Sequence, residues 1–180
     1  MRQQFVKALA IATVVGAMGI GRSAQAQRPF TIGISGGASV PVSDQSDVTK
    51  TGFTLTANVG VKPMGTPFTL QAEGGWNQWD VKGADANFRS LSLTGNLLYD
   101  LSMTPGIKPY VIGTAGLYHL TSSSNVAGGT FAESANKFGL GIGGGIRMPL
   151  SGFDTYIEAR YTHALDTSIS FVPITFGIRF

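Results

Sequence analysis

Apolar residues return at every second position in eight separate stretches of this chain, and no stretch shows the i, i+3, i+4 spacing of an amphipathic helix. The eight stretches are 30–35, 53–62, 68–77, 91–101, 110–121, 138–148, 156–162 and 172–180. In the second, for example, Phe53 and Leu55 alternate with Thr54 and Thr56, whereas the alternation in the fifth is weak. Such alternation puts apolar side chains on one face of a strand and polar ones on the other. We therefore expect an all-β chain of eight strands.

The connections between these stretches alternate in length. Short links rich in Pro and Gly occupy 61–68, 101–110 and 150–155, and longer polar links occupy 41–51, 80–87, 122–136 and 164–170. An antiparallel meander with its long loops gathered at one end produces this pattern. The sequence therefore predicts an eight-stranded antiparallel up-and-down β-barrel with four long loops at one end.

The polar face of the strands distinguishes a membrane barrel from a soluble one. That face is mostly Gly, Ser, Thr, Asn and Ala, and charged residues make up 13% of the chain, against a usual ~25%. A soluble barrel needs charges on its polar face, whereas small polar residues suit a narrow lumen. Because backbone groups in lipid must all be paired, strands cross a membrane only as a closed barrel. We therefore expect a transmembrane barrel, and a soluble ligand-binding barrel of the lipocalin type is the alternative.

The first 26 residues have the layout of a cleavable signal peptide. Arg2 and Lys7 precede an apolar run over 8–20, and Ala24 and Ala26 form an A-x-A cleavage site. The run is too short to cross a hydrocarbon core of about 30 Å as a helix, which disfavours an N-terminal membrane anchor. We predict export, cleavage after Ala26 and one barrel domain over 27–180. Ten basic and ten acidic residues remain in that domain, so its charge does not favour a nucleic-acid partner.

Three motifs make the chain resemble a known family, the small eight-stranded outer-membrane barrels of the outer membrane protein A and X kind. They are a Pro-Tyr, Gly-x-x-Gly strand at 108–118, a Gly-rich strand ending in Arg at 138–147 and a Glu-x-Arg-Tyr strand at 156–161. Phe176, Ile178 and Phe180 resemble the C-terminal signal that the outer-membrane assembly machinery reads. The resemblance implies a bacterial outer-membrane location, with lipid and lipopolysaccharide as partners. It implies no particular activity, because such barrels include adhesins, structural proteins and enzymes.

Four charged residues fall on the inward, polar face of the predicted barrel: Glu73, Arg147, Glu158 and Arg160. A carboxylate in a narrow lumen is costly unless an opposite charge pairs with it. We expect Glu158 to pair with Arg147 across one hairpin, and Glu73 to pair with an arginine from elsewhere in the lumen. We interpret the network as a structural plug. A gate on a narrow ion path is the alternative, although about eight strands leave little space for flow.

Aromatic residues cluster at two levels along the strands. Trp76, Tyr118 and Tyr161 fall near the long-loop ends, and Tyr99 and Tyr110 fall near the short-turn ends. Ordinary packing would account for any one of them, but two levels of aromatic residues are typical of the girdles at membrane interfaces. We therefore predict that these five residues form aromatic girdles.

The two histidines, His119 and His163, lie at the long-loop ends of strands. No third ligand has suitable spacing, so we predict no metal and no cofactor. The pair His119 and Thr121 is similar to the His-x-Ser pair of an outer-membrane lipid A deacylase, but Thr121 replaces the serine and Glu133 shows no sign of orienting His119. We predict a structural or surface-interaction role carried by the four long loops, without catalysis. A lipid-modifying enzyme and a narrow ion or solute pore are the alternatives.

Overall fold

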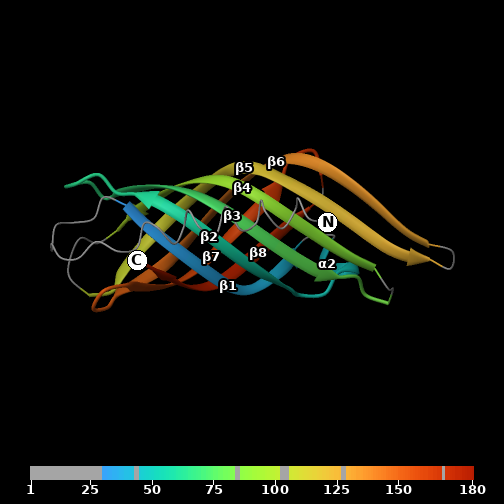
Figure 1. Cartoon of the computed structure of the whole chain (residues 1–180), viewed down its shortest axis with the longest axis horizontal. Coiled ribbons are helices and arrows are strands. Elements are labelled where there is room, and N and C mark those ends of the chain that lie inside the picture. The colour runs from blue at the N-terminus through green and yellow to red at the C-terminus, as the bar shows by residue number, and fades with distance from the viewer. Residues whose placement is uncertain (1–29, 43–44, 84–85, 102–105, 127–128, 168) are drawn as a thin grey trace, which may run out of the picture.

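The strands of this protein close into a barrel (Figure 1). The computed structural model describes residues 30–42, 45–83, 86–101, 106–126, 129–167 and 169–180. They form β1 (Phe30–Val42), a short helix α2 (Gln45–Val48), β2 (Gly52–Val61), β3 (Phe68–Asp80), β4 (Ala86–Asp100), β5 (Lys108–Val126), β6 (Gly129–Pro149), β7 (Asp154–Ala164) and β8 (Ser170–Arg179). Each strand pairs antiparallel with the next, and β1 pairs with β8 from Gly33 opposite Arg179 to Val42 opposite Ser170. This confirms the predicted eight-stranded up-and-down barrel.

The two faces of the barrel wall divide as the alternation predicts. Leu93 and Ile142 are 67% and 69% exposed, whereas Thr94 and Asn96 are only 4% and 3% exposed. Large apolar side chains therefore cover the outside and polar ones fill the lumen, which is the arrangement of a barrel surrounded by lipid. Within the described ranges, no helix is long and apolar enough to cross a membrane.

Glycines on β6 make room inside the barrel for tyrosine rings on β5. A Cβ at Gly139 would lie 2.6 Å from the ring of Tyr118, and a Cβ at Gly145 would lie 2.5 Å from that of Tyr110. Both tyrosines are 3% exposed and point into the lumen. Their assignment to the outer aromatic girdles is therefore wrong. The alternation within 110–121 cannot reveal this, because large residues occupy both faces of that strand.

The β5–β6 hairpin continues well beyond the rest of the barrel wall (Figure 1). We call this extended end of the hairpin, beyond Leu117 on β5 and Phe138 on β6, the ribbon. Its ladder runs to Val126 opposite Gly129. The described part of 122–136 is therefore strand, and the predicted long loop at this position is wrong. Residues 133–136 are all exposed, so neither face of the ribbon there packs against a core. A strand without a buried face needs no apolar alternation, and its polar sequence has the composition of a loop.

Candidate functional site

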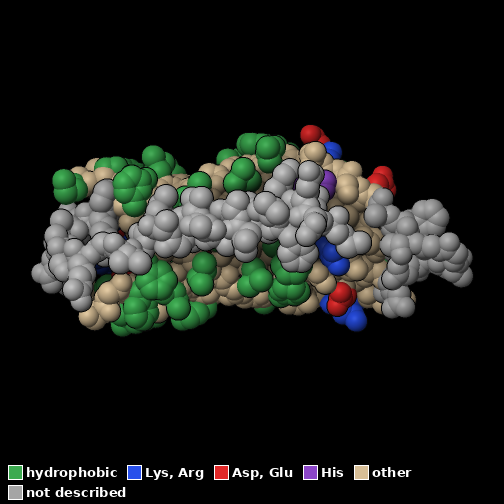
Figure 2. Space-filling view, viewed as in Figure 1, with side chains coloured by type: hydrophobic (Ala, Val, Ile, Leu, Met, Phe, Trp, Pro, Cys, Tyr) green, Lys and Arg blue, Asp and Glu red, His purple; other side chains and the backbone are tan. Residues whose placement is uncertain are grey.

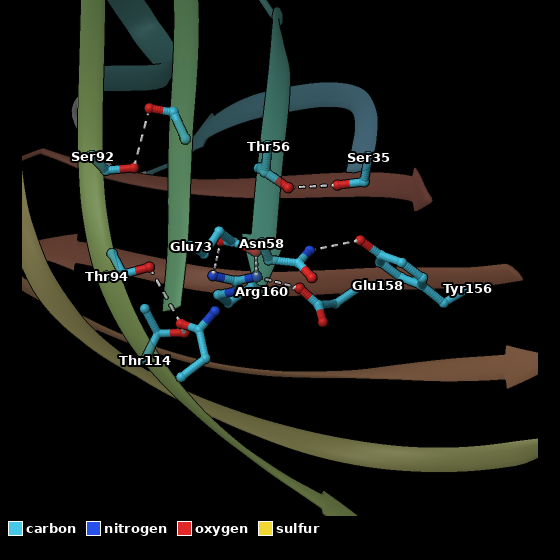
Figure 3. A network of polar contacts seen from close by, with 12 residues as sticks. Ser35, Thr56, Asn58, Glu73, Ser92, Thr94, Thr114, Tyr156, Glu158 and Arg160 are labelled. Carbon is cyan, nitrogen blue, oxygen red and sulfur yellow. Dashed lines mark hydrogen bonds and ion pairs between the residues drawn. The ribbon is translucent and has the colours of Figure 1, made fainter. Parts of the chain in front are cut away.

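Arg160 lies at the centre of a buried ion-pair network inside the lumen (Figure 3). Its Nη1 donates to Glu73 Oε1 at 2.8 Å, and its Nε donates to Glu158 Oε1 at 3.2 Å. Glu73 comes from β3, whereas Glu158 and Arg160 are alternate inward residues of β7. All three side chains are at most 9% exposed. One guanidinium thus serves two carboxylates, and Glu73 is paired with an arginine from another strand, as expected.

Arg147, the predicted partner of Glu158, belongs to a second cluster. Arg147 donates to Asp100 Oδ1 at 3.2 Å, and Lys62 also pairs with Asp100. Tyr110 separates the two clusters, because its hydroxyl donates to Glu158 Oε2 at 2.9 Å while the Arg147 guanidinium lies 5.1 Å from the centre of its ring. The expected pair between Glu158 and Arg147 is therefore wrong.

Aromatic side chains fill another level of the lumen. The ring centre of Trp79 lies 5.0 Å from that of Phe171 and 5.6 Å from that of Phe88, and Tyr118 lies 6.3 Å from Phe171. We call these four residues the aromatic cap. A cavity of about 30 Å³ between the cap and the Arg160 network has room for about two waters. Between these two levels the lumen is therefore packed with side chains. The cap was not predicted from the sequence, although the parity of β3 puts Trp79 on its inward face.

Aromatic residues also occupy two levels on the outside of the wall. They form the pairs Phe53–Trp76, Phe68–Tyr99 and Phe153–Phe180, with ring centres 4.9, 5.1 and 6.1 Å apart. Tyr161 is exposed on the same surface. Trp76, Tyr99 and Tyr161 are thus placed where girdle residues belong, and their role at the membrane interfaces stays a prediction.

The C-terminal residues expected to form the assembly signal share the outer face of β8. Phe176 and Phe180 are exposed there, and Ile178 lies between them at the alternate position. Their recognition by the assembly machinery stays a prediction. Ala24 and Ala26, the expected cleavage site, lie outside the described residues.

In the described part of the chain, each histidine has one polar side-chain partner at the rim. His119 Nδ1 lies 2.7 Å from Asn136 Oδ1 across the ribbon, and the hydroxyls of Thr121 and Ser134 share a hydrogen bond of 3.2 Å. His163 Nδ1 lies 2.9 Å from a serine hydroxyl on β8. No group of three His, Cys, Asp or Glu side chains in the described ranges could hold a metal ion. Asn136 was not predicted as the residue that orients His119, because the two are adjacent only through the strand register.

Among the described residues, one edge of β6 has no neighbouring strand where the hairpin extends beyond the rest of the barrel wall. The β6–β7 ladder ends at Gly139 opposite Ala164, and the Leu165 N–H then donates to the Phe138 carbonyl at 2.8 Å. On its other edge β6 stays paired with β5 as far as its first residue. In the described part of the chain, residues 129–137 therefore have a partner strand on the β5 side alone.

Comparison with known proteins points to one family. The family model of the outer membrane protein beta-barrel domain matches residues 10–180. Among solved structures, Neisserial surface protein A is 17% identical, with 84% of this chain and 96% of that chain covered and a TM-score of 0.64. Ail of Yersinia pestis, in complex with the heparin analogue sucrose octasulfate, is 17% identical, with 84% and 97% covered and a TM-score of 0.58. A major outer membrane protein of Thermus thermophilus is 12% identical, with 85% and 99% covered and a TM-score of 0.58. At these identities the likeness concerns the fold. No curated protein matches the chain.

Proposed function

The chain belongs to the family of the outer membrane protein beta-barrel domain, and from that premise we propose that it is a sealed membrane anchor which displays the ribbon as a docking edge. The protein lies in the bacterial outer membrane. The observation that carries the proposal is the unpaired edge of β6 over 129–137. An open edge is a template for a further strand, and proteins that do not use such an edge usually cover it or protect it with charges or proline. The open edge over 129–137 contains no proline, and its protection by charge is limited to Glu133 and Lys137.

The backbone groups on the open edge can be assigned from one hydrogen bond. The Phe138 carbonyl points toward β7, because it accepts from the Leu165 N–H. In an antiparallel ladder the N–H and C=O of one residue point to the same side, and this side alternates along the strand. Ser134 and Asn136 therefore direct their backbone groups to the open edge. An extended segment of a surface partner lying beside β6 would pair with them.

The packed lumen supports an anchor in preference to a pore. The aromatic cap and the Arg160 network leave a cavity of about 30 Å³ between them, which is far from a continuous water path. The solved complex of Ail with sucrose octasulfate supports an added binding role, since it shows that a barrel of this fold can carry a ligand. A surface role of the ribbon is therefore compatible with a barrel that conducts nothing.

Two substitutions at Ser134 test the docking edge. Ser134→Pro removes the N–H that faces the open edge, and proline is tolerated on an edge whose N–H is unpaired. Ser134→Ala removes the same hydroxyl and keeps the N–H. Cells carrying the wild type or either variant are compared for attachment to cultured epithelial monolayers and for clumping with one another. We expect only the cells that carry Ser134→Pro to lose attachment or clumping. If both variants behave as wild type, or if cells without the protein make equal contacts, the docking edge is refuted.

A second candidate, an enzyme acting on lipid A, is favoured by one contact. Asn136 fixes the imidazole of His119, as an orienting group does for a catalytic base. The Thr121 hydroxyl, however, bonds to Ser134, and no nucleophile–base hydrogen bond to His119 exists among the described residues. We expect His119→Ala to leave the lipid A mass spectrum of the cell unchanged. A mass change that requires the wild-type protein and is lost in this variant would establish the enzyme.

A further inference from the structure

The outer face of β3–β6 changes from apolar to polar at one level. Moving toward the ribbon, the outward positions change from Trp76 to Gln78, from Leu91 to Arg89, from Leu117 to His119 and from Phe138 to Asn136. In Figure 2 the hydrophobic side chains of the visible face give way to charged and histidine side chains toward the ribbon end of the barrel. The apolar band of a membrane barrel ends where the hydrocarbon ends. These polar residues therefore lie at the level of the lipid headgroups.

The strand register brings the polar residues together. Arg89 lies opposite Gln78 on β3 and opposite Thr121 on β5, and His119 lies opposite Asn136 on β6. His119 is the diagonal neighbour of Arg89, and side chains at such positions are about 7–8 Å apart, within reach of long side chains. We call these five residues the headgroup patch.

Arg89 is the arginine of the patch, and no carboxylate in the described part of the chain pairs with it. In the described ranges the three other arginines each pair with a carboxylate: Arg147 with Asp100, Arg160 with Glu73 and Arg179 with Asp154. Arg89 makes no ion pair there, not even with Asp80, its diagonal neighbour on β3. An exposed guanidinium at the edge of the hydrocarbon, with five donors and no acceptor among the described residues, is suited to an anion from the membrane.

His119 supplies a second polar group with a fixed orientation. Asn136 Oδ1 can only accept, so the 2.7 Å contact places a proton on His119 Nδ1. The other ring nitrogen, Nε2, has no partner in the described part of the chain. With the proton on Nδ1, Nε2 can accept a hydrogen bond from a hydroxyl outside the protein. On β7 and β8, by contrast, Tyr161 and His163 each bond to the Ser170 hydroxyl, and this group contains no arginine or lysine.

We propose that the headgroup patch binds the phosphorylated sugar headgroup of an outer-leaflet lipid. Arg89 would hold the phosphate, and His119 Nε2 would accept a hydrogen bond from a neighbouring hydroxyl. The Gln78 amide and Thr121 hydroxyl would bond to the sugar. Arginine is the side chain that best matches a phosphate, through paired N–H donors. The patch shares Asn136 with the open β6 edge, but its proposed ligand contacts are side chains of β3, β4 and β5. It lies on one side of the barrel, so a bound lipid would occupy a defined position beside β3–β6.

The test measures lipid binding to the whole protein in detergent micelles. The probes are diphosphorylated lipid A, the same lipid A after removal of its phosphates, and soluble glucosamine 6-phosphate, each titrated and read by native mass spectrometry. The variants are Arg89→Gln and His119→Gln, with Lys50→Gln as a control that loses one exposed charge outside the patch. Because all three residues are exposed, each variant should keep its fold, which unchanged gel mobility before and after heating verifies.

We expect Arg89→Gln to weaken the binding of diphosphorylated lipid A at least about tenfold, the usual scale for a charge-assisted hydrogen bond. His119→Gln should weaken it less, and Lys50→Gln should not change it. Equal binding by wild type and Arg89→Gln would overturn the proposal. So would an equal loss in Lys50→Gln, equal binding of lipid A without phosphates, or binding of glucosamine 6-phosphate as tight as that of lipid A, which would point to a soluble ligand.

Discussion

Replacing Arg160 with methionine should be the most damaging single change in the lumen. Methionine keeps much of the length and apolar stem of arginine but removes its charge and donors. Glu73 and Glu158, which both bond to Arg160, would then face one another across the lumen without a cation. Breaking a buried ion pair by removing one partner is strongly destabilising, because the remaining charge stays buried without compensation.

The structure sets the size of the effect. At the 2.8 Å between Arg160 Nη1 and Glu73 Oε1, two unit charges attract by about 6 kcal/mol at an effective dielectric constant of about 20. The desolvation of both groups offsets part of this, and removing one partner of a buried pair costs about 3–5 kcal/mol. Because two carboxylates lose their cation together, we expect a loss near the upper limit, about 5 kcal/mol.

The assay is urea unfolding of the protein in phosphocholine vesicles, followed by tryptophan fluorescence. The two tryptophans suit it, since Trp76 lies on the outer wall and Trp79 lies in the aromatic cap. With a slope of about 2 kcal/mol per molar urea, a loss of about 5 kcal/mol lowers the midpoint by about 2.5 M. The control is the triple variant Glu73→Gln, Glu158→Gln, Arg160→Met, which should recover most of the lost stability because neutral groups of similar size replace the whole network.

Two results would refute this reasoning. One is an Arg160→Met variant within about 1 kcal/mol of wild type, which is the size of an exposed ion pair. The other is a triple variant no more stable than Arg160→Met, since the loss would then come from packing and not from uncompensated charge.

Further predictions concern space, conduction and export. Gly116→Ala should reduce the folded fraction, because its Cβ would lie 2.3 Å from the Leu93 carbonyl oxygen, whereas Gly74→Ala meets nothing within 4 Å and should fold as wild type; gel mobility after refolding checks both. In planar bilayers the wild-type protein should show no conductance steps, and regular steps would contradict the packed lumen. Phe180→Ala should lower the amount recovered in the outer-membrane fraction, and equal amounts would argue against a role in assembly. N-terminal sequencing of the exported protein should begin at Gln27, and any other first residue would reject the predicted cleavage site.

Strand number, strand order and the facing of most side chains could be read from the sequence because they follow from local geometry. Side chains alternate strictly along a strand, so the apolar residues of 91–101 could be assigned to one face without knowledge of any other strand. The short and long links then predict the meander, and the need to pair every backbone group in lipid predicts closure. The same parity correctly put Glu73, Glu158, Arg147 and Arg160 in the lumen.

The pairing inside the lumen required the closed barrel. Parity says that Glu158 and Arg160 face inward, but the stagger between strands decides which residues of β3 and β7 meet across the lumen. Space decides the rest: Gly145 opposite Tyr110 leaves room for the tyrosine ring in the lumen, where the Tyr110 hydroxyl donates to Glu158, while Arg147 pairs with Asp100. The ribbon could not be predicted from the sequence for a related reason. A strand that is exposed on both faces has no buried side, so its sequence shows no apolar alternation.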